Sequence, residues 1–212
     1  AGKPGYSNTG RLFAATAVIA TRDKDPRKAM ENWLLMPGYR DVLLDRSLEQ
    51  VGAYADGALC VLDVIRGRSG KPFTETITFP FINVEVNGAP RFKDPVPAAV
   101  DIDVLGPEFK TLLARGTPPG AKGPVISPKQ KQVGFPLTCH FFGADQADVK
   151  CDVMANGKTI QGVLAHSIEG SRRIAAPGLW VFLPLEPLPK GDITMIWTIK
   201  GRAEKPVTFG TQ

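Results

Sequence analysis

Apolar residues near the N-terminus recur at the three- and four-residue spacing of one helix face. This spacing predicts a first helix over residues 8–20. A second helix is predicted to begin at Asp25-Pro26, because the Asp side chain accepts bonds from free N–H groups and proline fits the first helical position. Pro37-Gly38 is expected to end this second helix.

The spacing changes from helical to strand-like after residue 50. Residues 51–65 indicate a hairpin with its turn at Asp56-Gly57, followed by a buried strand. Residues 74–79 and 83–86 also carry strand signals, but the prolines around them cannot donate hydrogen bonds to a strand ladder. We therefore expect this middle region to form edge strands or ordered loops.

Gly and Pro are unusually frequent in this chain and are concentrated in one segment. The 22 Gly and 19 Pro make up about 19% of the 212 residues, against roughly 12% in average proteins. They cluster over residues 106–133, which we interpret as a connection between two domains. Beyond it, Asn156-Gly157 indicates a tight turn, since both residues tolerate a positive φ. Strand-like segments there are 137–142, 149–154, 159–165, 179–185, 194–200 and 206–209.

The series of short strands in the last third of the chain is typical of a small antiparallel sandwich. The predicted fold class is therefore α+β. We expect an N-terminal α+β unit over residues 1–105, the Pro/Gly-rich connection over residues 106–133, and an Ig-like antiparallel β-sandwich over residues 134–212.

Charge and hydropathy exclude two classes of partner. The net charge of +5 is spread along the chain without a run of about five like charges, so no nucleic-acid partner is expected. The longest apolar stretches, residues 59–65 and 179–185, are far shorter than the ~18 residues that span a bilayer, so no membrane span is expected. The sequence shows no leader pattern, so any secretory signal has been removed or lies outside it.

Three cysteines and two histidines are the candidates for redox or metal chemistry. Cys139 and Cys151 flank the predicted hairpin of residues 137–142 and 148–154, where a turn would place them opposite each other; a disulfide and two buried thiols are the two interpretations. Cys60 is predicted to be a small core residue. His140 and His166 do not have zinc-ligand spacing, so neither a metal nor another cofactor is expected.

Several short motifs occur in an order that bears on fold and function. In the first half they are Lys3-Pro4-Gly5-Tyr6, the helix with Ala29 and Trp33, residues 39–45, and the stretch from Val51-Gly52 to Asp63; in the second half they are residues 133–138 and 184–191. In this order they resemble a branch of the CAP superfamily (SCP-like, cysteine-rich secretory and pathogenesis-related proteins) found in extracytoplasmic bacterial proteins. The resemblance implies a CAP-like α/β unit followed by a β-sandwich, in a periplasmic or secreted protein.

The chain departs from this family at the cleft, where the family gathers two histidines and acidic residues. One histidine comes from an early long helix that this sequence lacks, and the position of the other is occupied by Tyr39. A phenol cannot replace a neutral imidazole as a metal ligand or base near neutral pH. The resemblance thus implies a truncated or degenerate CAP domain with Glu31, Tyr39 and Arg40 in a residual cleft. The alternatives are an exposed carboxylate at Glu31 and a surface position for Arg40.

Two classes of function follow from these observations. The leading hypothesis is a non-catalytic extracytoplasmic binding or structural subunit, associated with a protein partner or a second copy in a larger assembly. The alternative is a hydrolase that acts on cell-wall polymer, peptide or lipid through the residual cleft. Because the family's first helix is missing, we also expect Val61, Leu62 or Val64 to be exposed as an apolar patch for a partner.

Overall fold

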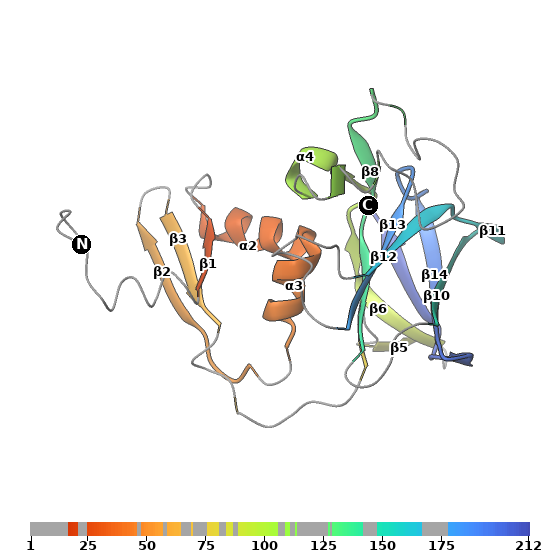
Figure 1. Ribbon diagram of the computed structural model, residues 1–212, viewed down its shortest axis with the longest axis horizontal. Coiled ribbons are helices and arrows are strands. Elements are labelled where there is room, and N and C mark those ends of the chain that lie inside the picture. Colours follow the sequence, from red (N-terminus) through yellow and green to blue (C-terminus); the bar gives the residue numbers. More distant parts are fainter. Residues whose placement is uncertain are drawn as a thin grey trace. The chain divides into compact units, whose positions relative to one another are not determined.

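The computed structural model divides the chain into two compact units, Ala1–Phe73 and Thr74–Gln212 (Figure 1). The structure describes residues 17–20, 25–45, 48–56, 59–64, 69, 76–80, 84–86, 89–105, 109–110, 113, 127, 129–141, 148–166 and 178–212.

Unit 1 contains a three-stranded antiparallel sheet in the order β1-β3-β2. Its strands are β1 (Ala17–Ala20), β2 (Gly52–Asp56) and β3 (Leu59–Asp63). The hairpin expected over residues 51–65 is confirmed by the pairing of β2 with β3. The helix expected over residues 8–20 is wrong where it is described, because Ala17–Ala20 pairs with β3 as a strand. Residues 8–16 lie outside the described part of the chain.

Two consecutive helices, α2 (Pro26–Leu35) and α3 (Pro37–Leu43), complete the described part of unit 1. The predicted start of α2 is confirmed: the Asp25 carboxylate accepts a 2.9 Å hydrogen bond from the Arg27 N–H, and Pro26 occupies the first turn. Helix α2 ends at Leu35, just before the predicted stop at Pro37-Gly38, but these two residues themselves begin α3.

The core of unit 1 lies between α2 and β3. Ala29 and Trp33 of α2 form one buried cluster with Cys60, Leu62 and Val64. The core position predicted for Cys60 is confirmed. The expected exposure of Leu62 and Val64 is wrong, because helix α2 covers both of these side chains within the same unit.

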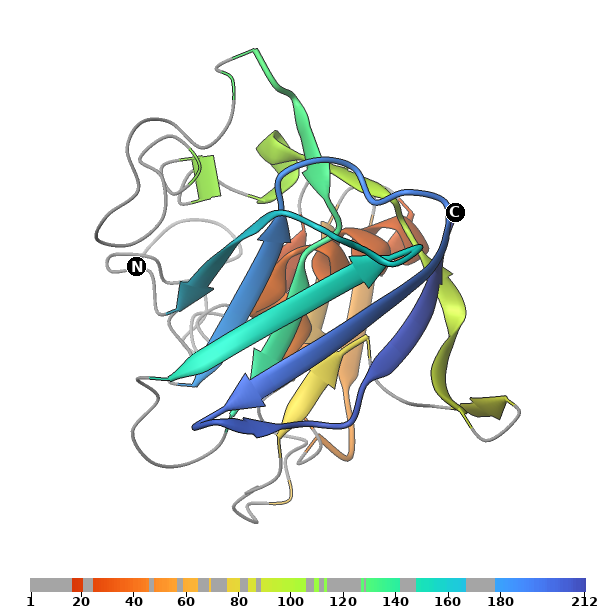
Figure 2. The same ribbon diagram turned by 90° about the vertical axis from the view of Figure 1, so that its right-hand side faces the viewer.

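Unit 2 is a β-sandwich with an additional short ladder and helix. Figure 2 shows the larger sheet in front, with strands in the order β11-β10-β14-β16-β6-β5 and β15 paired to β14. Its strands are β5 (Val84–Val86), β6 (Ala89–Val96), β10 (Val149–Ala155), β11 (Lys158–Thr159), β14 (Gly191–Ile199), β15 (Arg202–Ala203) and β16 (Val207–Thr211). The four-stranded sheet, in the order β12-β13-β9-β4, contains β4 (Ile77–Phe79), β9 (Leu137–His140), β12 (Gly162–His166) and β13 (Leu179–Pro184). Strands β7 (Ala99–Asp101) and β8 (Gln132–Gly134) form a separate ladder, and α4 (Ile102–Leu105) follows β7.

Alternating side chains build the core of unit 2. Along β14, Ile193, Met195 and Trp197 are buried while the residues between them are partly exposed, as expected for a strand with one face in the core. The two sheets meet where the ring of Phe79 on β4 contacts Phe92 on β6, with centroids 5.4 Å apart. The sandwich predicted for the C-terminal strands therefore also contains strands from earlier in the chain, such as β4 and β6.

The predicted α+β fold class with a CAP-like unit is wrong, because the described chain is mostly β and contains several sheets. Much of the added strand content comes from residues 74–105, which were expected to belong to the N-terminal unit. Strand β6 runs through Pro90 and Pro95 yet lies between β5 and β16, pairing in parallel with β16. This contact joins segments more than a hundred residues apart, so local pattern and proline content do not predict it.

The hairpin predicted between residues 137–142 and 148–154 is also wrong. Strand β9 pairs with β13 and β4 in the four-stranded sheet, whereas β10 pairs with β14 and β11 in the larger sheet. The tight turn predicted at Asn156-Gly157 is confirmed, since both residues have a positive φ (50° and 73°) between β10 and β11.

Candidate functional site

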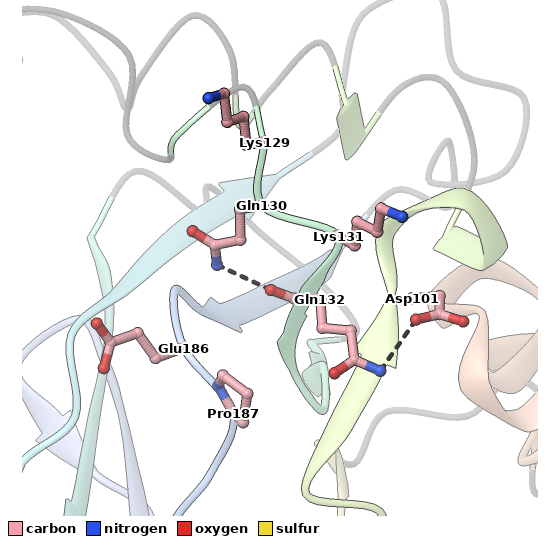
Figure 3. Close-up of a pocket in the computed structure, with 7 residues that line it drawn as sticks. All are labelled: Asp101, Lys129, Gln130, Lys131, Gln132, Glu186 and Pro187. Carbon is pink, nitrogen blue, oxygen red and sulfur yellow. Dashed lines mark hydrogen bonds between the residues drawn. The ribbon is translucent and has the colours of Figure 1, made fainter.

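A polar hollow of about 500 Å³ opens beside the β7–β8 ladder of unit 2 (Figure 3). The ladder pairs Asp101 with Gln132, and the backbone N–H of Ile102 donates a 2.9 Å hydrogen bond to the carbonyl of Lys131. These bonds fix the segment before β8 along one side of the hollow. The lining residues are Asp101, Lys129, Gln130, Lys131, Gln132, Glu186 and Pro187.

Two glutamine side chains are held in place at this site. Gln132 donates from Nε2 to the Asp101 carboxylate at 3.0 Å. Gln130 donates from Nε2 to the carbonyl of Gln132 at 2.8 Å and to the carbonyl of Leu185. Each amide therefore has a defined orientation before any ligand arrives, which lowers the entropy cost of binding.

The loop that follows β13 forms the opposite side of the hollow. Its buried Leu188 anchors it, and the Leu188 N–H donates a 2.8 Å hydrogen bond to the carbonyl of Ala98. At Gly134 the strands approach so closely that a Cβ would lie 2.6 Å from Pro184 Cβ and 2.7 Å from the Glu186 carbonyl oxygen. A glycine in β8 is thus required to bring Glu186 and Pro187 next to the ladder.

Both signs of charge line the hollow. Lys129, Lys131 and Glu186 are exposed, and with the other described residues they form no ion pair. Nearby, Asp103 forms an ion pair with Lys110; the hydrogen bond and charge of Lys110 lower the pKa of Asp103, and the charge of Lys131 adds a smaller lowering. The two lining ammonium groups are therefore accessible to a ligand.

The residues expected in a residual cleft occupy different environments in unit 1. Arg40 is fully buried on α3, and its Nε donates to the carbonyl of Leu34 at 2.6 Å while Nη2 donates to Leu35 at 3.4 Å. Burial lowers the pKa of Arg40 to about 9, so the guanidinium is still protonated at neutral pH. Tyr39 is half-buried against the unit 1 core, and Glu31 is exposed on α2.

The three cysteines are free thiols in the structure. Cys139 lies opposite Thr78 and Trp180 in the four-stranded sheet, and Cys151 lies opposite Trp197 in the larger sheet. Burial raises the pKa of Cys139 to about 12 and that of Cys151 well above its usual value, with a smaller contribution from the Cys139 thiol to the latter. Both are therefore protonated, and weak nucleophiles, near neutral pH.

The two histidines lie on different strands of the four-stranded sheet, His166 on β12 and His140 on β9, with β13 between them. His166 stacks on the indole of Trp180 with centroids 4.4 Å apart, and burial lowers its pKa. His140 lies on β9, opposite Leu179. In the part of the chain that the structure describes, no group of three His, Cys, Asp or Glu side chains is arranged to hold a metal ion.

Comparison with family models, curated proteins and solved structures finds no match for this chain. The CAP resemblance therefore stays a prediction from the sequence motifs. None of the helices that the structure describes is long and apolar enough to cross a membrane.

Sequence reasoning did not predict the residues of the hollow. The segment that carries Lys129 and Lys131 falls within residues 106–133, which were interpreted as a connection. One signal was present: lysines alternate there with Gln130 and Gln132 immediately before a strand. The pairing that turns this alternation into a site involves Asp101 and the loop at Glu186, which are distant in sequence.

Proposed function

We propose that this chain is a non-catalytic extracytoplasmic binding protein whose ligand occupies the hollow beside the β7–β8 ladder. The observation that carries the proposal is the pair of preoriented amides, Gln130 and Gln132, placed between accessible charged side chains. The volume of the hollow lies within the ~300–1,000 Å³ range of small-molecule sites.

The environments of several reactive side chains support the same interpretation. Arg40 bonds helix carbonyls in the core of unit 1, and His166 is stacked on an indole. The thiol of Cys139 has a pKa raised to about 12, whereas a nucleophilic cysteine needs a lowered one. These side chains are engaged in packing and helix termination.

The location outside the cytoplasm and membership of a larger assembly rest on the resemblance to CAP proteins. Light scattering at micromolar concentration tests the second part. A second copy would give a multiple of the 22.8 kDa chain mass. A single species at the chain mass would contradict self-association.

The binding function is tested by retention of intact ligand. We expect the native chain, but not the urea-unfolded chain, to bind at least one member of a panel of soluble polysaccharides and peptides. Mass spectrometry of the recovered ligand should show no cleavage after prolonged incubation. Products that accumulate with time would contradict the non-catalytic assignment, and a panel that does not bind would contradict the binding role.

A further inference from the structure

We propose that the hollow binds an acidic oligosaccharide, a chain of sugar rings that carry carboxylates. This inference rests on the proposed binding function and names its ligand class. It starts from the composition of the lining, which combines two ammonium groups, two carboxylates, two amides and one proline. No charged group among these is buried, so the ligand remains partly solvated.

The positions of the two lysines favour a ligand with repeated anionic groups. Figure 3 shows Lys129 and Lys131 extending from one segment to different sides of Gln130. Ammonium groups that extend in different directions favour a ligand with more than one anionic group. A chain that carries a carboxylate on successive rings offers one anionic group to each lysine, and the net charge of +5 attracts it from a distance.

The carboxylates and amides of the hollow favour hydroxyl groups between the anionic ones. Asp101 and Glu186 have oxygen atoms that accept hydrogen bonds from hydroxyls, and the fixed amide groups of Gln130 and Gln132 offer further polar atoms. Pro187 supplies an apolar ring for the C–H face of a sugar. Sugar hydroxyls both donate and accept, so one ligand can satisfy carboxylate and amide partners together.

Other polyanions fit this lining less well. Single-stranded nucleic acid is bound largely by stacking of its bases on aromatic side chains, and none of the described residues that line the hollow is aromatic. An acidic peptide carries closely spaced carboxylates, and its hydrogen-bonding groups lie mainly on its backbone. An acidic saccharide places hydroxyl donors beside the carboxylates of Asp101 and Glu186 and its own charge beside the lysines.

The test uses calorimetric titration of the full chain with tetragalacturonate, with cellotetraose as the neutral saccharide and tetraglutamate as the acidic peptide. We expect saturable binding of tetragalacturonate that weakens as salt screens the lysines. The variant K129A/K131A should bind it about tenfold more weakly, a loss typical of two partly exposed ion pairs. The control K158A/K205A removes the same charge from exposed positions outside the lining and should bind as the wild type does.

The variant E186Q separates hydrogen bonding from simple charge attraction. If Glu186 accepts sugar hydroxyls, E186Q should weaken tetragalacturonate binding; if the chain only attracts anions, removal of a negative charge should strengthen it. Three results would overturn the saccharide assignment. They are stronger binding of tetragalacturonate by E186Q, an equal loss of its affinity in K129A/K131A and K158A/K205A, and an affinity for tetraglutamate equal to that for tetragalacturonate. Lysine-dependent binding of cellotetraose or tetraglutamate alone would overturn it too, while leaving the proposed binding function intact. Thermal unfolding of each variant should match the wild type, which shows that the fold is retained.

Discussion

Arg40 illustrates, at the scale of single residues, how a charged side chain becomes part of a protein core. Helix α2 ends at Leu35 with carbonyls that lack helical partners, and α3 begins two residues later. From the first turns of α3, Arg40 reaches back to Leu34 and Leu35 and satisfies these acceptors. A positive charge there also opposes the negative end of the helix dipole.

Replacement of this side chain should destabilise unit 1. We expect R40A to lower the free energy of unfolding by about 3 kcal/mol, because it leaves buried carbonyls unsatisfied and a cavity behind. R40K should recover part of this lost stability, because its ammonium group can still donate to a carbonyl. The recovery should be incomplete, because lysine lacks the forked donor geometry of arginine. Urea unfolding followed by circular dichroism measures both, with E31A on the exposed side of α2 as the control. An R40A variant as stable as E31A would show that the carbonyl bonds contribute little.

The thiols give a second prediction at this scale. Because burial, followed by the charge of Glu204, raises the pKa of Cys139 from 9.0 to about 12, the folded state keeps its proton where the unfolded state loses it. The unfolding free energy should therefore fall as pH rises between about 9 and 12, and C139A should show a shallower fall. A C139A slope equal to that of the wild type would mean that this thiol titrates normally.

Labelling of the same thiols tests the disulfide predicted from the sequence. At pH 8, a disulfide reagent such as DTNB should modify Cys139 and Cys151 only after urea unfolding, since both are buried with raised pKa values. Peptide mass spectrometry identifies the labelled positions. If both stay unlabelled in urea without reductant and the digest yields their two peptides joined to each other, they form the disulfide.

At the scale of elements, close packing between strands decides where the hollow forms. Strand β8 passes the end of β13 with no room for a side chain at Gly134, and this approach brings the loop at Glu186 beside the β7–β8 ladder. Gly210 on β16 offers a contrast within the same unit, because a Cβ there would meet nothing within 4 Å. The two glycines therefore differ in packing while both lie in strands.

The variant G134A should destabilise unit 2 by about 2 kcal/mol, because its methyl group would overlap backbone and side-chain atoms of the facing segment. It should also weaken any ligand held by the hollow. The matched variant G210A should change stability little, since its methyl group enters open space. Urea unfolding of both variants gives the comparison, and equal stabilities would show that the segment at Pro184 moves aside easily.

The whole molecule consists of two units whose boundary falls after Phe73. Residues 74–105 contribute β4, β5, β6 and β7 to unit 2, so the C-terminal sandwich is completed by strands that precede the Pro/Gly-rich segment. Strand β6 pairs with β16, and β4 pairs with β9. The sandwich therefore depends on contacts between the beginning and the end of this unit.

Fragments should reproduce this dependence. We expect residues 74–212 to unfold cooperatively on their own, because they retain both sheets. Residues 134–212 should not, because loss of β4 and β6 uncovers buried residues such as Phe209. Calorimetry of the two fragments is the measurement, and a cooperative transition in the shorter one would contradict the role assigned to the early strands.

Local signals in the sequence were sufficient to predict several structural features of the chain. The Asp25-Pro26 start of α2, the hairpin of β2 and β3, and the turn at Asn156-Gly157 each depend on neighbouring residues, and the structure confirms them. The C-terminal strands also follow from local alternation. These features can be predicted from the sequence because helix capping, turn geometry and strand periodicity are determined within a few residues.

Tertiary structure alone decided which strands pair and where a ligand site forms. Residues 17–20 match a helix pattern yet form a strand, because pairing with β3 outweighs the local preference. Consecutive strands β9 and β10 separate into different sheets, and Arg40 enters the core. The hollow joins Asp101, residues 129–132 and Glu186 through contacts between distant segments. Such contacts depend on the energy of the whole packed chain, which no local pattern contains.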